Sequence, residues 1–170
     1  MKILFVCTGN TCRSVMAHGL LQKMLEEKAQ QAERGSGEDE QITIASAGLA
    51  ALEGQPATPE ALAQLQEEGV DFSHHRARRV TREMLEEADL VLAMTRSHLA
   101  SLQQHFPDFQ EKIWLFSRYC LDREEDIPDP FGIPGSYKTV SGKLKEGIQA
   151  LVGKLQQLNY TGKDRSPDEQ

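Results

Sequence analysis

The chain has 170 residues, of which 39% are hydrophobic and 26% are charged, and its formal net charge at pH 7 is −7. This composition is typical of a single soluble globular domain. The negative charge argues against a general nucleic-acid-binding protein, because phosphate backbones attract positive charge. No apolar segment approaches the ~20 residues of a membrane span, and the N-terminal run is too short for a signal peptide. We therefore expect a cytoplasmic protein that binds neither nucleic acid nor a membrane.

In chain order, the apolar run at 2–6 predicts a buried strand, and the residues after it favour a turn. From Ser14 onward the apolar residues follow one helical stripe, which predicts a helix. The polar, glycine-bearing segment 33–41 predicts a surface loop, and the run at 42–48 predicts a second strand.

The rest of the chain continues this alternation of helix and strand. The predicted elements are a helix over 58–68, a brief helix from Thr81, a strand over 88–94, a helix over 95–105, a strand over 112–117 and a helix over 136–158. The polar residues 161–170 predict a disordered tail, so that 1–160 form a single domain.

Strands that alternate with helices indicate a parallel sheet covered on both faces, in a doubly wound α/β sandwich of three layers. In such folds, ligands bind beyond the carboxyl ends of the strands. The segment CTGNTCRS at 7–14 follows the first predicted strand and is therefore a candidate binding loop.

This loop has the residues of an anion-binding site. Gly9 lets the backbone curl, and Asn10 is among the few other residues that tolerate a left-handed conformation. Backbone N–H groups that converge at the start of a helix attract an anion, and Arg13 offers a planar fork matched to two phosphate oxygens. The same positive focus favours the thiolate form of Cys7. Together these residues indicate attack on phosphorus through a phosphocysteine intermediate, although Cys-x5-Arg alone is a weak motif.

Phosphoryl transfer also needs an acid for the leaving group, and Asp129 is the candidate. Pro128 and Pro130 flank it and stiffen its loop, which follows the fourth predicted strand and reaches the same edge of the sheet. From the residues alone, Asp129 is as often a solvated turn residue. Other acids of this loop stay open as alternatives: Asp122, Glu124, Glu125 and Asp126.

The three cysteines are Cys7, Cys12 and Cys120, an odd number that predicts no disulfide framework in a reducing compartment. Cys7 and Cys12 are wrongly spaced for a zinc site, and Cys120 is expected to be inert packing. Four histidines also lack metal-like spacing and are expected at the surface: His18, His74, His98 and His105. We expect no metal and no cofactor.

Five segments together resemble the low-molecular-weight protein tyrosine phosphatase family, in order and over nearly the whole chain. They are CTGNTCRS at 7–14, SAG at 46–48, SHHRAR at 73–78, ADLVLAMT at 88–95 and DPFG at 129–132. The resemblance implies a flavodoxin-like sheet with strand order 2-1-3-4. It also implies that Cys7 is the nucleophile, Arg13 the phosphate ligand and Asp129 the general acid.

The resemblance implies further roles around the loop. Asn10 is expected to be held in a strained conformation by Ser14 and by His75. The residues expected to bind phosphate or substrate are Thr8, Gly9, Asn10, Thr11, Cys12, Ser14, Leu49 and Phe131. The family also implies a reversible Cys7–Cys12 disulfide that switches activity off, whereas the residues alone fit Cys12 equally well as a small packing side chain.

Two positions depart from the usual tyrosine phosphatase pattern. A bulky aliphatic residue is usual where Thr11 stands, and Tyr or Trp is usual where Phe131 stands. This combination resembles the bacterial protein arginine phosphatases and implies hydrolysis of the P–N bond of phosphoarginine. A guanidinium is polar and narrower than a phenol, so the Thr11 hydroxyl suits it, and Asp129 can pair with its charge. Thr8 and Leu49 near the mouth provide little aromatic surface for a phenol.

Other functions stay open at this point. Phosphotyrosine is the nearest alternative substrate, and Thr11 then has no selective role. An arsenate reductase shares the loop but needs a further redox cysteine pair, and only Cys120 is available. A non-catalytic phosphate-binding module would need neither Cys7 nor Asp129. We expect a monomeric phosphatase whose partners are phosphorylated proteins and whose product is inorganic phosphate.

Overall fold

The computed structural model describes residues 1–31 and 41–163, with side chains up to 158. Its elements are β1 (Lys2–Cys7), α1 (Arg13–Gln31), β2 (Thr43–Gly48), α2 (Pro59–Glu67), α3 (Arg82–Glu87), β3 (Leu90–Ala93), α4 (Arg96–His105), the 3₁₀ helix η1 (Pro107–Lys112), β4 (Ile113–Leu115), α5 (Phe116–Leu121) and α6 (Ser136–Lys163). Almost all of the predicted loop at 33–41 lies outside the described residues, as does the predicted tail from 164 onward. Within the described part, no helix is both long and apolar enough to cross a bilayer.

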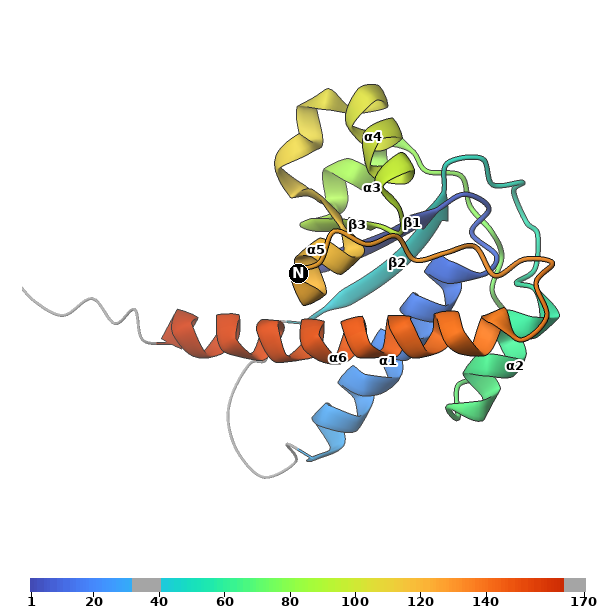
Figure 1. The fold of residues 1–170 in the computed structure, drawn as a ribbon. Helices are drawn as coiled ribbons and strands as arrows, with labels where there is room; N and C mark the ends of the chain where they lie inside the picture. Colours follow the sequence, from blue (N-terminus) through green and yellow to red (C-terminus); the bar gives the residue numbers. More distant parts are fainter. Residues whose placement is uncertain (32–40, 164–170) are drawn as a thin grey trace, which may run out of the picture.

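The strands form a parallel sheet in the order β2-β1-β3-β4, which confirms the predicted doubly wound fold and its strand order (Figure 1). Apolar residues alternate between the two faces of β1, because successive side chains of a strand point to opposite sides. Ile3 and Phe5 join the core beneath α1 and α6, whereas Leu4 and Val6 join the core beneath α3 and α4. Burial on both faces explains why β1 reads as one continuous apolar run.

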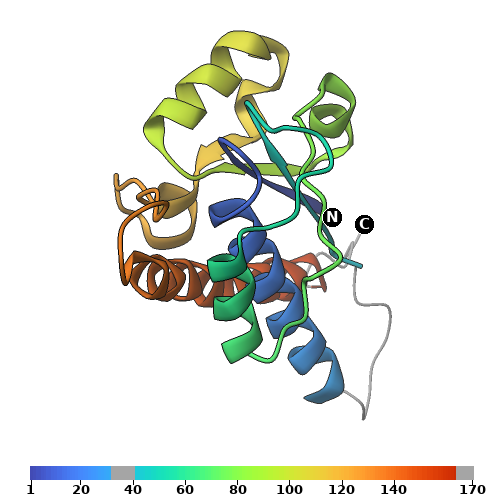
Figure 2. The ribbon, with the colours of Figure 1, turned by 90° about the vertical axis from the view of Figure 1, so that its right-hand side faces the viewer.

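The helices cover the sheet as two layers (Figures 1 and 2). On one face α1 packs against α6, with α2 beside α1 and α5 beside α6; on the other face lie α3 and α4. Threonine caps fix several helix starts, because a threonine oxygen accepts a hydrogen bond from an otherwise unpaired N–H of the first turn. Thr58, Thr81 and Thr95 do this for α2, α3 and α4.

One predicted element is partly wrong. The apolar run at 112–117 predicts a single strand, but β4 ends at Leu115 and the chain continues at once as α5. A short apolar run does not distinguish a strand from a buried helix. Here Phe116 and Cys120 turn inward as one helical face of α5, which packs against α6. The last helix also extends to Lys163, beyond its predicted end at 158 and through the first three residues of the disordered tail predicted at 161–170.

The carboxyl ends of the strands meet at one edge of the sheet, and Figure 2 looks onto this edge. The loop after β1 lies there between the loop after β2 and the segment after α5. Backbone bonds tie the first two loops together: Leu49 N–H donates to Cys7 O and Ala50 N–H donates to Thr8 O, each at 2.9 Å. The segment after α5 is tied to β3, because Ile127 N–H donates to Met94 O at 2.9 Å. The fold thus gathers two distant segments around the residues that follow β1.

Candidate active site

The loop at 8–12 curls at Asn10, which has φ 55 and is fully buried. Its Nδ2 donates to Ser14 Oγ (2.9 Å), its Oδ1 accepts from Arg78 N–H (3.0 Å), and its carbonyl accepts from His75 Nε2 (2.8 Å). A left-handed conformation is costly for a residue other than glycine, so these contacts hold the loop in shape. The contacts with Ser14 and His75 are the ones that the family resemblance implies. Gly9 lies outside the left-handed region, so the curl depends on Asn10.

Cys7 ends β1 and is only 3% exposed. Its Sγ lies 3.0 Å from Ser14 Oγ. The same Oγ accepts a hydrogen bond from the Asn10 amide, which can only donate, so the Ser14 hydroxyl proton is free to point at the sulfur. Ser14 is therefore placed to donate to a Cys7 thiolate.

Arg13 begins α1 and lies buried directly beside the segment after α5. Its Nη1 donates to Ile127 O (3.0 Å), and its Nη2 lies 3.9 Å from Asp129 Oδ2. The Asp129 side chain is 61% exposed and accepts from Phe131 N–H through Oδ1 (3.0 Å). A buried guanidinium and an exposed carboxyl group thus face each other at the edge of the sheet, so the structure brings together two of the residues that the sequence analysis singles out.

Three of the other four acids of this loop pair with other arginines, and the fourth, Glu125, is exposed. Asp122 and Glu124 pair with Arg118, and Asp126 accepts from both the backbone N–H and the Nε of Arg96. These hydrogen bonds lower the pKa of Asp126 below its ordinary value, so it stays ionised. Among the described residues, the ion pairs of the loop therefore favour Asp129 as the acid nearest to Arg13.

Cys12 lies beneath the loop, and its neighbours are hydroxyl groups. Its Sγ is 3.4 Å from Tyr137 OH and 3.7 Å from both Thr58 Oγ1 and Thr11 Oγ1. Burial, together with the Cys12 contact, raises the pKa of Tyr137 to about 12, so the phenol stays protonated. All three cysteines are free thiols here, and burial raises the pKa of Cys120 to about 12. Cys120 is therefore inert packing in α5, as expected.

The expectation that four histidines lie at the surface is only partly right. His74 and His105 are exposed, but His98 is only 7% exposed and its Nε2 lies 2.7 Å from Thr8 Oγ1. His18 is half-buried, where its ring meets Phe72 edge-on. Burial lowers the pKa of both inward-facing histidines to about 4, so both are neutral near pH 7. The burial of a histidine in an amphipathic helix depends on which loop packs over it, and the local sequence does not show this.

The residues predicted around the mouth differ in exposure. Thr8 is exposed, Thr11 is half-buried, and Phe131 is 72% exposed. Leu49 is half-buried because its side chain packs on the core of the α3 and α4 face, although its N–H binds the Cys7 carbonyl. Leu52, which the sequence analysis passed over, is 66% exposed in the same loop after β2. The loops that follow β1 and β2 therefore expose a hydroxyl at Thr8 and an aliphatic side chain at Leu52, and Phe131 is an exposed ring in the segment after α5.

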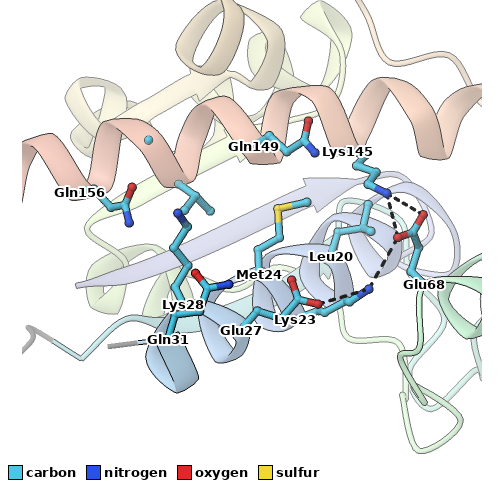
Figure 3. Close-up of a pocket in the computed structure, with 12 residues that line it drawn as sticks. Leu20, Lys23, Met24, Glu27, Lys28, Gln31, Glu68, Lys145, Gln149 and Gln156 are labelled. Atoms are coloured by element: carbon cyan, nitrogen blue, oxygen red, sulfur yellow. Dashed lines mark hydrogen bonds and ion pairs between the residues drawn. The ribbon is translucent and has the colours of Figure 1, made fainter. Parts of the chain in front are cut away.

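A separate groove of about 400 Å³ lies between α1 and α6, away from the loop at 8–12 (Figure 3). Ion pairs cross one end of it, where Glu68 meets both Lys145 and Lys23. None of the residues predicted for catalysis lines this groove. Within the described residues, no cluster of His, Cys, Asp and Glu side chains is arranged to hold a metal ion.

Comparison with known proteins agrees with this geometry. A protein-arginine-phosphatase of Bacillus subtilis is 35% identical over 158 residues, which cover 91% of this chain and 97% of that protein. The low molecular weight protein-tyrosine-phosphatase Wzb of Salmonella typhi is also 35% identical, over 88% of this chain and 93% of its own. A solved structure of the arginine phosphatase YwlE, described as a mutant with a phosphorylated active-site serine in place of cysteine, matches with a TM-score of 0.82. Its identity is 33%, and the match covers 92% of this chain and 96% of that one.

The family model described as low molecular weight phosphotyrosine protein phosphatase matches residues 2–161. That range contains the whole sheet and each of the segments around the loop at 8–12. Sequence, fold and site geometry agree, and the protein is a cysteine-based phosphatase that belongs to the low molecular weight phosphotyrosine protein phosphatase family.

Proposed function

We propose that this enzyme hydrolyses phosphoarginine on proteins through a phosphocysteine intermediate. The observation that carries the proposal is the hydroxyl of Thr11 in the loop at 8–12, which we call the phosphate loop. The resemblance to tyrosine phosphatases implies a bulky aliphatic side chain at this position. Overall sequence identity does not distinguish the two candidate substrates, because a relative named protein-arginine-phosphatase and one named protein-tyrosine-phosphatase are both 35% identical to this chain.

In the first step, the Cys7 thiolate attacks phosphorus and the P–N bond breaks. The Arg13 guanidinium and the backbone N–H groups of the loop hold the phosphoryl oxygens, which keep their negative charge throughout. Asp129 gives its proton to the departing nitrogen, so the arginine side chain leaves as a guanidinium. The products of this step are S-phosphocysteine and an unmodified arginine.

In the second step, the Asp129 carboxylate takes a proton from water as the water oxygen bonds to phosphorus. The S–P bond breaks, inorganic phosphate leaves, and Cys7 returns to its thiolate form. The Ser14 hydroxyl, 3.0 Å from the sulfur, donates to the thiolate as it departs. The same contact serves the first step, because it stabilises the nucleophile before attack.

The contacts of Thr11 support a role for its side chain in selecting the leaving group. Thr11 O accepts from Thr58 N–H (3.0 Å), which fixes the residue against the start of α2. Its Oγ1 lies 3.7 Å from Cys12 Sγ, in the loop that follows the nucleophile Cys7. A hydroxyl there offers a planar cation a polar partner. Once Asp129 has given up its proton, its carboxylate can pair with the charge of the departing guanidinium, whereas a departing phenol is neutral and offers no such charge.

The test compares kcat/KM for a phosphoarginine peptide and a phosphotyrosine peptide of the same sequence. We expect the wild type to prefer phosphoarginine, and Thr11→Ile to shift the preference at least tenfold toward phosphotyrosine, which corresponds to about 1.4 kcal/mol. Thr43→Ile makes the same chemical change at an exposed position at the start of β2 and leaves the preference unaltered. Equal preference in all three proteins would refute the role of Thr11.

Two further variants separate the chemical steps. Cys7→Ser abolishes turnover but keeps inorganic phosphate binding, because the backbone cradle is intact. Asp129→Asn slows release of the leaving group and affects a poor leaving group more than a good one. A Cys7→Ser protein that still turned over substrate would exclude the phosphocysteine route.

A further inference from the structure

His98 reaches the phosphate loop from a different layer of the fold. It lies in the first turn of α4, where its N–H donates to Thr95 Oγ1 (3.1 Å), so the helix cap fixes its backbone. Its Nε2 lies 2.7 Å from Oγ1 of Thr8, the residue directly after the nucleophile. The ring is 7% exposed, which is unusual for a histidine in a helix that starts at the surface.

The surroundings of the ring fix where its proton lies. Burial, and then the charge of Arg13, lowers the pKa of His98 to about 4, so the ring is neutral at working pH. Nδ1 is buried and has no hydrogen-bond partner among the described residues. An unpaired lone pair is tolerated in an interior better than an unpaired N–H, so the proton belongs on Nε2. Nε2 then donates to Thr8 Oγ1, and the Thr8 hydroxyl keeps its own proton to donate outward.

We propose that His98 is a positioning residue that pins the start of the phosphate loop by donating to Thr8. His75 donates to Asn10 O from the segment after α2, so two histidines hold the loop from opposite sides of β1. The bond to Thr8 fixes the first backbone N–H after Cys7, and preorganised N–H groups are what a phosphoryl group needs. The inference rests on the phosphatase reaction described above but does not depend on which amino acid carries the phosphate.

A double-mutant cycle tests the contact. His98→Phe keeps an aromatic ring but removes the donor, and Thr8→Val keeps the shape but removes the hydroxyl. We expect each to lower kcat/KM for p-nitrophenyl phosphate about tenfold and to weaken inhibition by inorganic phosphate similarly, the effect of one lost hydrogen bond. The double variant should be no worse than either single one, because both remove the same bond. His98→Gln retains an N–H and should recover part of the loss.

His105→Phe is the matched control, since His105 is exposed at the other end of the same helix. It should leave both kinetic constants unchanged. Thermal unfolding of every variant distinguishes a destabilised fold from a displaced loop. If His98→Phe lowers the stability of the fold, Thr8→Val still tests the hydrogen bond, because it leaves the histidine ring in place. Additive losses in the double variant, or full activity of His98→Phe, would overturn the positioning role. A wild type that neither hydrolyses the aryl phosphate nor binds phosphate would overturn the phosphatase reaction as well.

Discussion

Gly48 ends β2 directly beneath the phosphate loop, where it pairs in register with Cys7. A Cβ placed on it would lie 2.5 Å from Thr8 O and 2.9 Å from Asn10 N. Both atoms belong to the backbone, so no side-chain rotation relieves the clash. Gly48→Ala is therefore expected to displace the loop itself.

The size of the effect follows from these distances. Ordinary contact begins near 3.4 Å, so Thr8 O and the new methyl must separate by about 0.9 Å. Overpacking of this kind costs about 1–3 kcal/mol of unfolding free energy. A shift of about 1 Å in a group that contacts the reacting atoms lowers kcat/KM about 100-fold. We therefore expect a loss of activity much larger than the loss of stability explains.

Steady-state kinetics with an aryl phosphate, read beside thermal unfolding, provide the assay. Gly147→Ala is the control, because its Cβ would come within 2.5 Å of two ring atoms of Phe116. That clash lies between α6 and α5, far from the loop in the chain, and should lower Tm by a few degrees while kcat/KM stays near wild type. Wild-type kcat/KM in Gly48→Ala would contradict the expected displacement of the loop. So would a loss of kcat/KM in both variants that follows their loss of Tm.

Three other substitutions test the packing and the charges. Thr81→Ala removes the oxygen that accepts from Met84 N–H and should lower the unfolding free energy by about 1 kcal/mol in urea, with kcat/KM unchanged. A Cβ at Gly142 in α6 would meet no atom within 4 Å. Gly142→Ala should therefore raise the unfolding free energy by up to about 1 kcal/mol, measured in urea, because alanine favours a helix more than glycine does. The pKa of His18 is lowered by burial to about 4, so the unfolded chain binds its proton first as the pH falls. Stability should therefore fall between about pH 6.5 and 4. His18→Gln should reduce that fall in unfolding free energy, measured with urea, by up to about 3 kcal/mol, while His98, whose pKa is also about 4, keeps contributing to it.

The centre of the site is predictable because its parts are contiguous in the chain. Cys7 and Arg13 stand at the two ends of one loop, between a buried strand and a helix, and that arrangement is local. Asp129 is different, since a flanking pair of prolines is equally compatible with a solvated turn. Its assignment rests on the family resemblance, to which the structure adds the distance of 3.9 Å from Arg13.

Features that depend on tertiary packing are not predictable in this way. The apolar run at 112–117 suits a strand or a buried helix. The structure places its second half in α5, where the Phe116 ring fills the space left by Gly147 in α6. Likewise His98 shows in the sequence only as a polar residue early in a helix. Its burial depends on Thr8, which lies 90 positions away, arriving at the same edge of the sheet.

The contacts around the loop bear on how the enzyme binds phosphate. The strain at Asn10 is held by Ser14 of α1, His75 and the backbone of Arg78, and the start of the loop is held by His98. These contacts are made by groups of the protein itself, and most come from segments that only the complete fold brings together. N–H groups that are held in place in this way stabilise the charge that develops in a transition state, because they need no reordering as the reaction proceeds. By the same reasoning, a substitution that loosens any of these contacts should weaken catalysis through the geometry of the loop, even though Cys7, Arg13 and Asp129 are unchanged.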